Sequence, residues 1–247
     1  MSMLTDQQDA FGHEIYDYLK NSGGAEEIIE RNDRYIDTSG GPKAYFAEYK
    51  DWTPAEKKAM RYAKGRALDI GSGAGRCCLY LQRMGLEVTA IDNSPLAIEA
   101  CKLRGVKDAR VIPISQMDST LGVFDTFLMM GNNFGLFGSF LGAKRLLKKL
   151  YRITTRNGRI ITSSRDVYKT QDPSHLAYQD SNREKGRMSG QVRIRVRYKQ
   201  YIGPWFDYLM VSKTEMGNIL DGTGWRVNKY LDHNESQYIA IIDKVKK

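Results

Sequence analysis

A glycine-rich segment at 68–76, reading Leu-Asp-Ile-Gly-Ser-Gly-Ala-Gly-Arg, constrains the fold of this chain more than any other feature. An apolar stretch precedes the glycines and a helical pattern follows them. Glycines between a strand and a helix let the backbone turn tightly and let a ligand approach closely. The next apolar stretch ends in Asp92, where a carboxylate can accept ribose hydroxyls. The pattern predicts a nucleotide-binding loop.

Strands and helices are expected to alternate after this loop. The expected strands are 66–70, 87–92, 109–115, 124–130 and 159–163, and the expected helices between them are 75–84, 94–104 and 140–154. Such alternation is typical of a parallel sheet with right-handed crossovers. Asn157 and Gly158 predict a turn before the fifth strand. Two closing strands, 225–231 and 238–245, follow a helix at 213–220 that begins with a capping box at Ser212, and Thr53 with Glu56 predicts another capped helix start near the N-terminus.

The chain is expected to fold in four consecutive parts. Residues 1–60 read mostly as helix and predict an N-terminal helical cap, followed by a Rossmann-like core at 61–165. Residues 166–211 predict an inserted substrate-capping loop and antiparallel hairpin, because 166–190 are polar and 191–201 alternate strictly. Residues 212–247 then complete the core sheet. The expected class is α/β, with a seven-stranded, mostly parallel sheet and helices on both faces.

The glycine spacing decides between adenosine cofactors. The dinucleotide fingerprint G-x-G-x-x-G lacks its third glycine here, because Arg76 stands at that position. The spacing Asp-x-Gly-x-Gly-x-Gly resembles the first motif of the class I S-adenosylmethionine (SAM)-dependent methyltransferases, and the resemblance extends over roughly 60–165. It implies SAM as the cofactor and S-adenosylhomocysteine (SAH) as the product.

The resemblance also implies roles for matching positions. The loop residues Gly71, Ser72, Gly73 and Gly75 would line the methionine and ribose portions, and Asp69 would orient the loop. Asp92 would bind the ribose, with Asn93 beside the adenine. Gln116 and Met117 stand where this family brackets the adenine. The family often has an acid in that segment, and the nearest one here is Asp118. Met117 could equally be an ordinary core residue. Met130 ends the fourth strand and completes the expected cofactor residues.

The acceptor should bind beyond the fourth strand, since ligands of open α/β sheets lie at the carboxyl ends of the strands. That loop carries Asn132 and Asn133, for which turn chemistry is the alternative reading. Arg165, at the end of the fifth strand, is a further candidate for acceptor contact. His175 and Tyr198 are candidate general bases, needed only if the acceptor must lose a proton.

The stretch 191–201 carries Arg193, Arg195, Arg197 and Lys199 on one face of the expected strand. This face either stays solvated, as charged strand edges often do, or binds an anionic acceptor.

Three functional hypotheses follow from the sequence: methylation of a small molecule at N or O, methylation of RNA or protein through the basic hairpin, and a non-catalytic SAM-binding module. The likeness to small-molecule methyltransferases favours the first, and nucleic acid is a partner that is not favoured.

Composition bounds the remaining expectations. The net charge is +9, from 38 basic and 29 acidic residues, which leaves an anionic partner open. The three cysteines, two of them adjacent, predict reduced thiols and a cytoplasmic location. No metal site is expected, because the three histidines are scattered. The sequence contains no run of 18 apolar residues, so no membrane span is expected. A homodimer through the exposed hairpin stays an open alternative.

Overall fold

The computed structural model describes residues 2–20 and 26–245, and contacts divide the chain into two compact units. Unit 1 takes in residues up to 52, 65–117 and 193–206, and unit 2 takes in 53–64, 118–192 and 207 onward. Each unit therefore combines three separate stretches, whereas the sequence predicted four consecutive parts. The difference arises because sheet pairing joins segments that are far apart along the chain.

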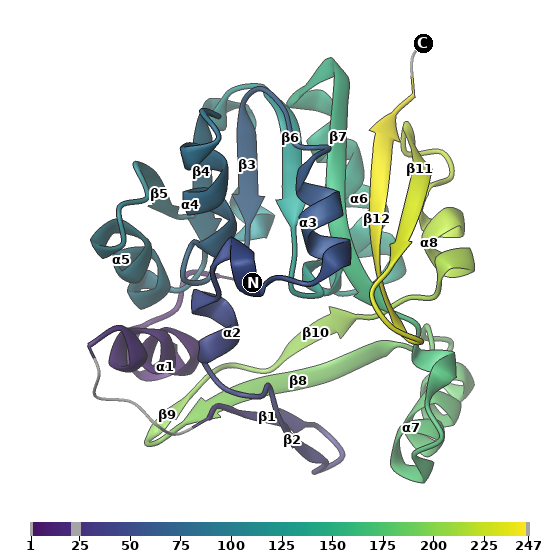
Figure 1. The fold of residues 1–247 in the computed structure, drawn as a ribbon. Coiled ribbons are helices and arrows are strands. Elements are labelled where there is room, and N and C mark those ends of the chain that lie inside the picture. The colour runs from purple at the N-terminus through teal and green to yellow at the C-terminus, as the bar shows by residue number, and fades with distance from the viewer. Residues whose placement is uncertain (1, 21–25, 246–247) are drawn as a thin grey trace. The chain divides into compact units, whose positions relative to one another are not determined.

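Two sheets organise the elements, as labelled in Figure 1. The larger sheet has seven strands in the order β11-β12-β7-β6-β3-β4-β5, and the smaller has the order β10-β8-β1-β2 with β9 paired to β8. The strands of the larger sheet are β3 (Ala67–Ile70), β4 (Val88–Asp92), β5 (Asp108–Val111), β6 (Phe124–Met129), β7 (Thr154–Arg165), β11 (Trp225–Asp232) and β12 (Gln237–Lys244). Those of the smaller sheet are β1 (Ile28–Arg31), β2 (Ile36–Thr38), β8 (Gln191–Tyr198), β9 (Tyr201–Ile202) and β10 (Phe206–Leu209).

Strand directions confirm the predicted mostly parallel sheet. The pairs β3–β4, β4–β5 and β6–β7 are parallel, while β12 runs antiparallel to both β7 and β11. Parallel neighbours need crossover connections, which helices provide. The α-helices are α1 (Ala10–Leu19), α2 (Lys43–Phe46), α3 (Pro54–Met60), α4 (Arg76–Arg83), α5 (Pro95–Leu103), α6 (Phe140–Arg152), α7 (Pro173–Glu184) and α8 (Lys213–Leu220).

Short 3-10 helices punctuate the loops: η1 (Asp6–Gln8), η2 (Tyr49–Asp51), η3 (Ile114–Gln116), η4 (Ser119–Leu121), η5 (Asn133–Phe137) and η6 (Val167–Lys169). The capping boxes expected from sequence are present at Thr53 with Glu56 and at Ser212 with Glu215. In each, the hydroxyl accepts the third helical amide while the Glu carboxylate accepts the cap amide. These local signals therefore set the first residues of α3 and α8.

Unit 1 contains two completely buried strands. All residues of β3 and β4 are buried, as expected of strands covered on both faces. Ile15 of α1 packs with Ala74, Ala97 and Ala100, and Phe11 and Tyr45 contact the same cluster. The N-terminal helix is thereby tied to the glycine loop and to α5.

Unit 2 buries most of β6 beside the apolar stripe of α6. That stripe consists of Ala143, Leu146, Leu147 and Leu150, spaced at three and four residues. Trp225 of β11 donates its indole N–H to the carbonyl of Leu147 at 2.9 Å, so the second half of α6 is fixed against β11. No helix in the described ranges has the length and apolarity that a bilayer crossing requires.

Three local expectations were wrong. Residues 28–38, predicted as part of a helical cap, form β1 and β2 instead. Asn157 and Gly158, predicted as a turn before the fifth strand, lie inside the longer β7. Residues 173–184, expected to be loop, form α7, because Asp172 caps it and Pro173 occupies its first turn. Sheet pairing decides the first two, and the third depends on the helix-start residues Asp172 and Pro173 within a polar stretch.

Candidate active site

The glycine loop makes a tight left-handed path between β3 and α4. Gly71, Gly73 and Gly75 have φ angles of 71°, 52° and 75°. The amides of Gly71 and Ser72 donate to the carbonyl of Ile91 at 2.9 and 3.1 Å. A Cβ at Gly75 would lie 2.8 Å from Val106 Cγ2 and 2.9 Å from Cys101 Sγ, so this position needs glycine both for its φ and for space.

Asp92 lies at the carboxyl end of β4 and faces this loop. Its Oδ2 accepts the Gly73 amide at 3.1 Å, and its Oδ1 accepts the Ser94 amide at 3.0 Å. The residue is only 7% exposed, and burial raises the pKa of its carboxyl to about 6, against the lowering effect of these two amides. The ionised form of a buried carboxylate is costly, and each further hydrogen bond that it accepts stabilises that form.

Asp69 is a second buried acid in the same unit. Burial raises the pKa of its carboxyl to about 6, with Cys78 and Arg76 lowering it and the charge of Asp92 raising it. Its Oδ2 accepts the Cys78 thiol at 3.1 Å. Two buried acids around one glycine loop favour a ligand that brings hydroxyl donors and positive charge.

The three cysteines are free and buried. Cys101 donates its thiol to the carbonyl of Gly73 at 3.1 Å, and burial raises the pKa of this thiol to about 12. Burial also raises the pKa of Cys78. Both thiols therefore stay protonated and act as hydrogen-bond donors that hold the loop.

The expected adenine neighbours fall in unit 1. Asn93 is half-buried; its backbone carbonyl accepts the Leu4 amide at 3.1 Å, and its side-chain amide donates to the Ser2 carbonyl at 3.2 Å. Gln116 is exposed in η3, while Met117 is completely buried. The roles of Asn93, Gln116 and Met117 toward the adenine stay predictions.

In unit 2, the loop after β6 is fixed through its backbone. Asn132 adopts the left-handed conformation, with φ 63° and ψ 18°. Its amide donates to Ser163 Oγ at 2.7 Å, and its carbonyl accepts the Tyr208 hydroxyl at 2.6 Å. The conformation agrees with the turn chemistry weighed for this residue, and it leaves the side chain of Asn132 available at the pocket described next.

A pocket of about 90 Å³ opens in unit 2 at the carboxyl ends of β6 and β7. It is lined by Glu56, Met130, Gly131, Asn132, Ser163, His233, Gln237, Tyr238 and Ile239. Two sequence-predicted residues, Met130 and Asn132, thus lie together. Glu56 was recognised only as a helix cap, and His233 had no signal in the sequence. The antiparallel pairing that sets Gln237 opposite Arg165 brings the turn containing His233 to this edge.

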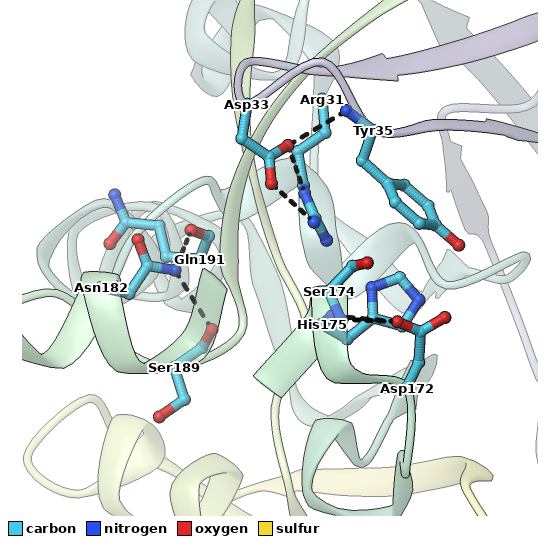
Figure 2. A network of polar contacts seen from close by, with 9 residues as sticks. All are labelled: Arg31, Asp33, Tyr35, Asp172, Ser174, His175, Asn182, Ser189 and Gln191. Carbon is cyan, nitrogen blue, oxygen red and sulfur yellow. Dashed lines mark hydrogen bonds and ion pairs between the residues drawn. The ribbon is translucent and has the colours of Figure 1, made fainter. Parts of the chain in front are cut away.

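The other acceptor-side candidates do not line this pocket. Arg165 is exposed at the end of β7, and Asn133 begins η5. His175 lies in the first turn of α7, where Figure 2 shows Asp172 accepting the backbone amides of Ser174 and His175, at 2.7 and 3.3 Å. These placements leave their proposed roles in catalysis as predictions.

Tyr198 belongs to unit 1 and is 1% exposed. Its hydroxyl donates to Asp17 Oδ2 at 3.1 Å, and burial together with Asp17 raises its pKa. A tyrosine whose pKa is raised gives up its proton less readily near neutral pH. The geometry therefore favours a structural role for this residue over that of a general base.

Comparisons with known proteins agree with this geometry. The methyltransferase domain family matches residues 68–162. The chain is 36% identical over 83 residues to the ubiquinone biosynthesis O-methyltransferase of Methylocella silvestris, a match that covers 31% of this chain and about a third (32%) of that enzyme. A SAM-dependent methyltransferase from Bacteroides fragilis, solved with SAH, has a TM-score of 0.83 at 28% identity over 99% of this chain and 98% of that one. A SAM-dependent methyltransferase of Methanosarcina mazei shares the fold at 16% identity, with a TM-score of 0.61 over 80% of this chain and 100% of that one.

A parallel α/β sheet with a glycine loop and an acid ending the next strand defines an enzyme that binds a nucleoside cofactor. The matches above identify which nucleoside cofactor this is. The chain carries a methyltransferase domain at residues 68–162, its fold is that of the class I, Rossmann-like SAM-dependent methyltransferases, and its cofactor is SAM. The donor set fits this cofactor, because Asp92 offers a buried carboxylate to ribose hydroxyls and Asp69 adds negative charge near the loop. The described residues contain no group of His, Cys, Asp and Glu arranged to hold a metal ion.

Cofactor affinity is expected to fall as the pH drops through 6. Hydroxyl donors require the ionised form of Asp92, whose pKa is about 6 in the cofactor-free protein. About a tenth of this carboxyl is ionised at pH 5, so SAH binding should weaken about tenfold between pH 7.5 and pH 5. Calorimetry across this range measures the change, and an affinity independent of pH would contradict the role of Asp92.

The same raised pKa has an opposite effect on the stability of the cofactor-free protein. The folded chain keeps this proton up to about pH 6, whereas the unfolded chain loses it near the ordinary value of 3.8. The folded state thus binds more protons between these pH values, and the contribution of Asp92 to stability decreases as the pH rises from 4 to 6. Binding of SAH should therefore release protons at pH 5.5, which titrations in buffers of different ionisation enthalpy detect.

Proposed function

We propose that this enzyme methylates a nitrogen or oxygen atom of a small molecule that enters the pocket of unit 2. Bound SAM supplies an activated methyl group whose transfer neutralises the sulfonium charge. The acceptor lone pair forms the new bond to the methyl carbon, while the electron pair of the broken C–S bond stays on sulfur. The residues of this chain have to orient the acceptor and exclude water.

The size and lining of the pocket support a small acceptor. Its lining combines apolar surface from Met130 and Ile239 with polar groups from Asn132, Gln237 and Glu56. Such a mixture is typical of sites that bind small organic molecules. His233 contributes an imidazole to this lining, and an imidazole can act as a general base, so His233 is the candidate acceptor for a proton that leaves an N–H or O–H nucleophile.

The basic strand gives less support to a nucleic-acid substrate. Glu30 of β1 accepts Arg195 at 2.9 and 3.0 Å and Arg197 at 3.3 Å, so a carboxylate offsets these two charges within unit 1. Arg195 also lies over the ring of Trp205, 4.6 Å from its centroid. Arginines engaged in this way are less available to phosphates than a solvated basic face.

An acceptor screen tests the proposal. The enzyme is incubated with labelled SAM and separate panels of small phenols, small amines, bulk RNA and unfolded protein. Label should appear on a phenol or an amine, and a His233→Ala variant should lower that rate by about 100-fold. Efficient labelling of RNA, with a steep loss on adding salt, would contradict the proposal.

Tyr208→Phe is expected to slow transfer to the acceptor without weakening SAH binding. The change removes the hydroxyl that holds the Asn132 carbonyl and should destabilise the fold by about 1 kcal/mol. The matched control is Tyr230→Phe, which removes a similar 2.9 Å hydrogen bond to the Lys213 carbonyl from a residue that does not itself line the pocket. Equal rates for the two variants in the same acceptor assay would show that the Asn132 loop does not position the acceptor.

A further inference from the structure

One buried carboxylate, that of Asp9, caps two helices at once. Its Oδ1 accepts the Gly12 amide of α1 at 3.0 Å, and its Oδ2 accepts the Leu96 amide of α5 at 3.0 Å. The Ser94 hydroxyl donates to the same Oδ2 at 2.9 Å, and Asp9 has no exposed surface. A capping residue ordinarily serves its own helix alone. Asp9 therefore links the N-terminal segment to the start of α5.

This link continues to the cofactor loop. The Ser94 amide donates to Asp92 Oδ1 at 3.0 Å, and the Ser94 hydroxyl accepts the Ala97 amide at 2.9 Å. Asp92 in turn accepts the Gly73 amide at 3.1 Å. Asp9, Ser94, Asp92 and Gly73 thus form one continuous series of hydrogen bonds, which ends at the carboxylate expected to bind ribose.

The helix that Asp9 begins also covers the glycine loop. A Cβ built on Gly73 would lie 3.6 Å from Phe11 Cζ and 3.9 Å from Ile15 Cδ1, both on α1. Farther along α1, Asp17 accepts the Tyr198 hydroxyl and, at 2.6 Å, the Lys199 ammonium. The helix is therefore held at both ends, by Asp9 at the cofactor loop and by Asp17 at β8.

We propose that Asp9 is a positioning residue for cofactor binding: it latches α1 over the glycine loop and orients Asp92 through Ser94. Its effect concerns the cofactor rather than the acceptor pocket, because its hydrogen-bond partners are Gly12, Ser94 and Leu96. The proposal rests on SAM binding at Asp92, and it is independent of which small molecule accepts the methyl group.

The variant Asp9→Asn distinguishes the link from Asp9 to α5 from the ordinary capping of α1. Asparagine caps a helix about as well as aspartate, so its Oδ1 can still accept the Gly12 amide. Its amide group, however, would present donors to the Leu96 N–H and could not replace Oδ2. SAH binding measured by calorimetry should weaken about tenfold, and hydrogen exchange of residues 10–19 should become faster. Ser94→Ala, which breaks the same link from its other side, should weaken SAH binding similarly.

Asp17→Asn is the matched control, because it loosens the same helix away from the cofactor loop. It should leave the SAH dissociation constant within about twofold of wild type. Folded Asp9→Asn and Ser94→Ala variants that bind SAH as tightly as wild type would overturn the proposal. Equal weakening by Asp17→Asn would also overturn it, since general loosening of α1 would then explain the effect. Failure of the wild-type enzyme to bind SAH would instead contradict the cofactor site.

Discussion

Asp92→Ala is expected to weaken SAH binding by about 100-fold or more. Each hydrogen bond to a charged group contributes about 1.5–3 kcal/mol, and the alanine variant would lose both of the bonds that the Asp92 carboxylate is expected to accept from the ribose hydroxyls. A loss of about 3 kcal/mol corresponds to a factor somewhat above 100 in the dissociation constant. Calorimetry with SAH measures it directly, and turnover at saturating SAM shows whether the loss is confined to binding.

Stability measurements separate this loss from unfolding. Asp92 also holds the Gly73 and Ser94 amides, so the alanine variant loses two native bonds. It also loses a buried carboxylate that is costly to ionise, since burial raises its pKa to about 6. These effects oppose each other, and the free energy of unfolding should change by less than about 2 kcal/mol.

Asp118→Ala supplies a control for the cofactor role. Asp118 is the nearest acid to the expected adenine segment, but it is exposed and its carboxylate accepts the amide of Thr120 at 2.9 Å. SAH affinity should change by no more than about threefold. If Asp118→Ala weakened binding as much as Asp92→Ala, the ribose site would have been assigned to the wrong acid.

Gly135→Ala is expected to produce a large loss of stability in unit 2. Its Cβ would lie 2.2 Å from Cε1 and Cζ of Tyr208. Tyr208 cannot move away at low cost, because its hydroxyl bonds the Asn132 carbonyl at 2.6 Å. Overpacking of this kind costs about 1–3 kcal/mol, and we expect the upper end of that range. Denaturant unfolding measures it, and transfer to the acceptor should fall as well.

Gly217→Ala is the control for this glycine. Gly217 lies inside α8, and a Cβ there would meet no atom within 4 Å. The change should raise stability by about 0.5–1 kcal/mol, because alanine loses less backbone freedom in a helix. A Gly135→Ala variant as stable as wild type would show that the Tyr208 ring is not fixed against the Asn132 loop.

Local sequence signals predicted the elements that depend on a few neighbouring residues. The glycine loop at 68–76, the acid at the end of β4 and the capping boxes at Thr53 and Ser212 are each specified within a short window. Loop conformation and helix caps depend on residues that are adjacent in the sequence, so they can be predicted without knowing the tertiary contacts. The parallel α/β class followed from the regular alternation.

Pairings between distant segments were not predictable in this way. Residues 28–31 form a strand that pairs with β8, where Glu30 stands opposite Arg195, 165 positions later in the sequence. The residues of β1 by themselves do not indicate this partner. The pocket is a second case, because His233 and Glu56 meet Asn132 only through the antiparallel addition of β12 to β7. Short strands carry weak propensities, so tertiary context decides them.

By itself, the sequence determined the cofactor class, because the glycines of the loop and the acid at position 92 act through backbone conformation and one carboxylate that lie close together along the chain. Only the tertiary structure decided how those parts are supported. Asp9, 83 positions before Asp92, reaches it through Ser94, and a turn near the C-terminus contributes His233 to the pocket beside β6. The physical reason is that burial, strand register and shared hydrogen bonds depend on residues that only folding brings into contact.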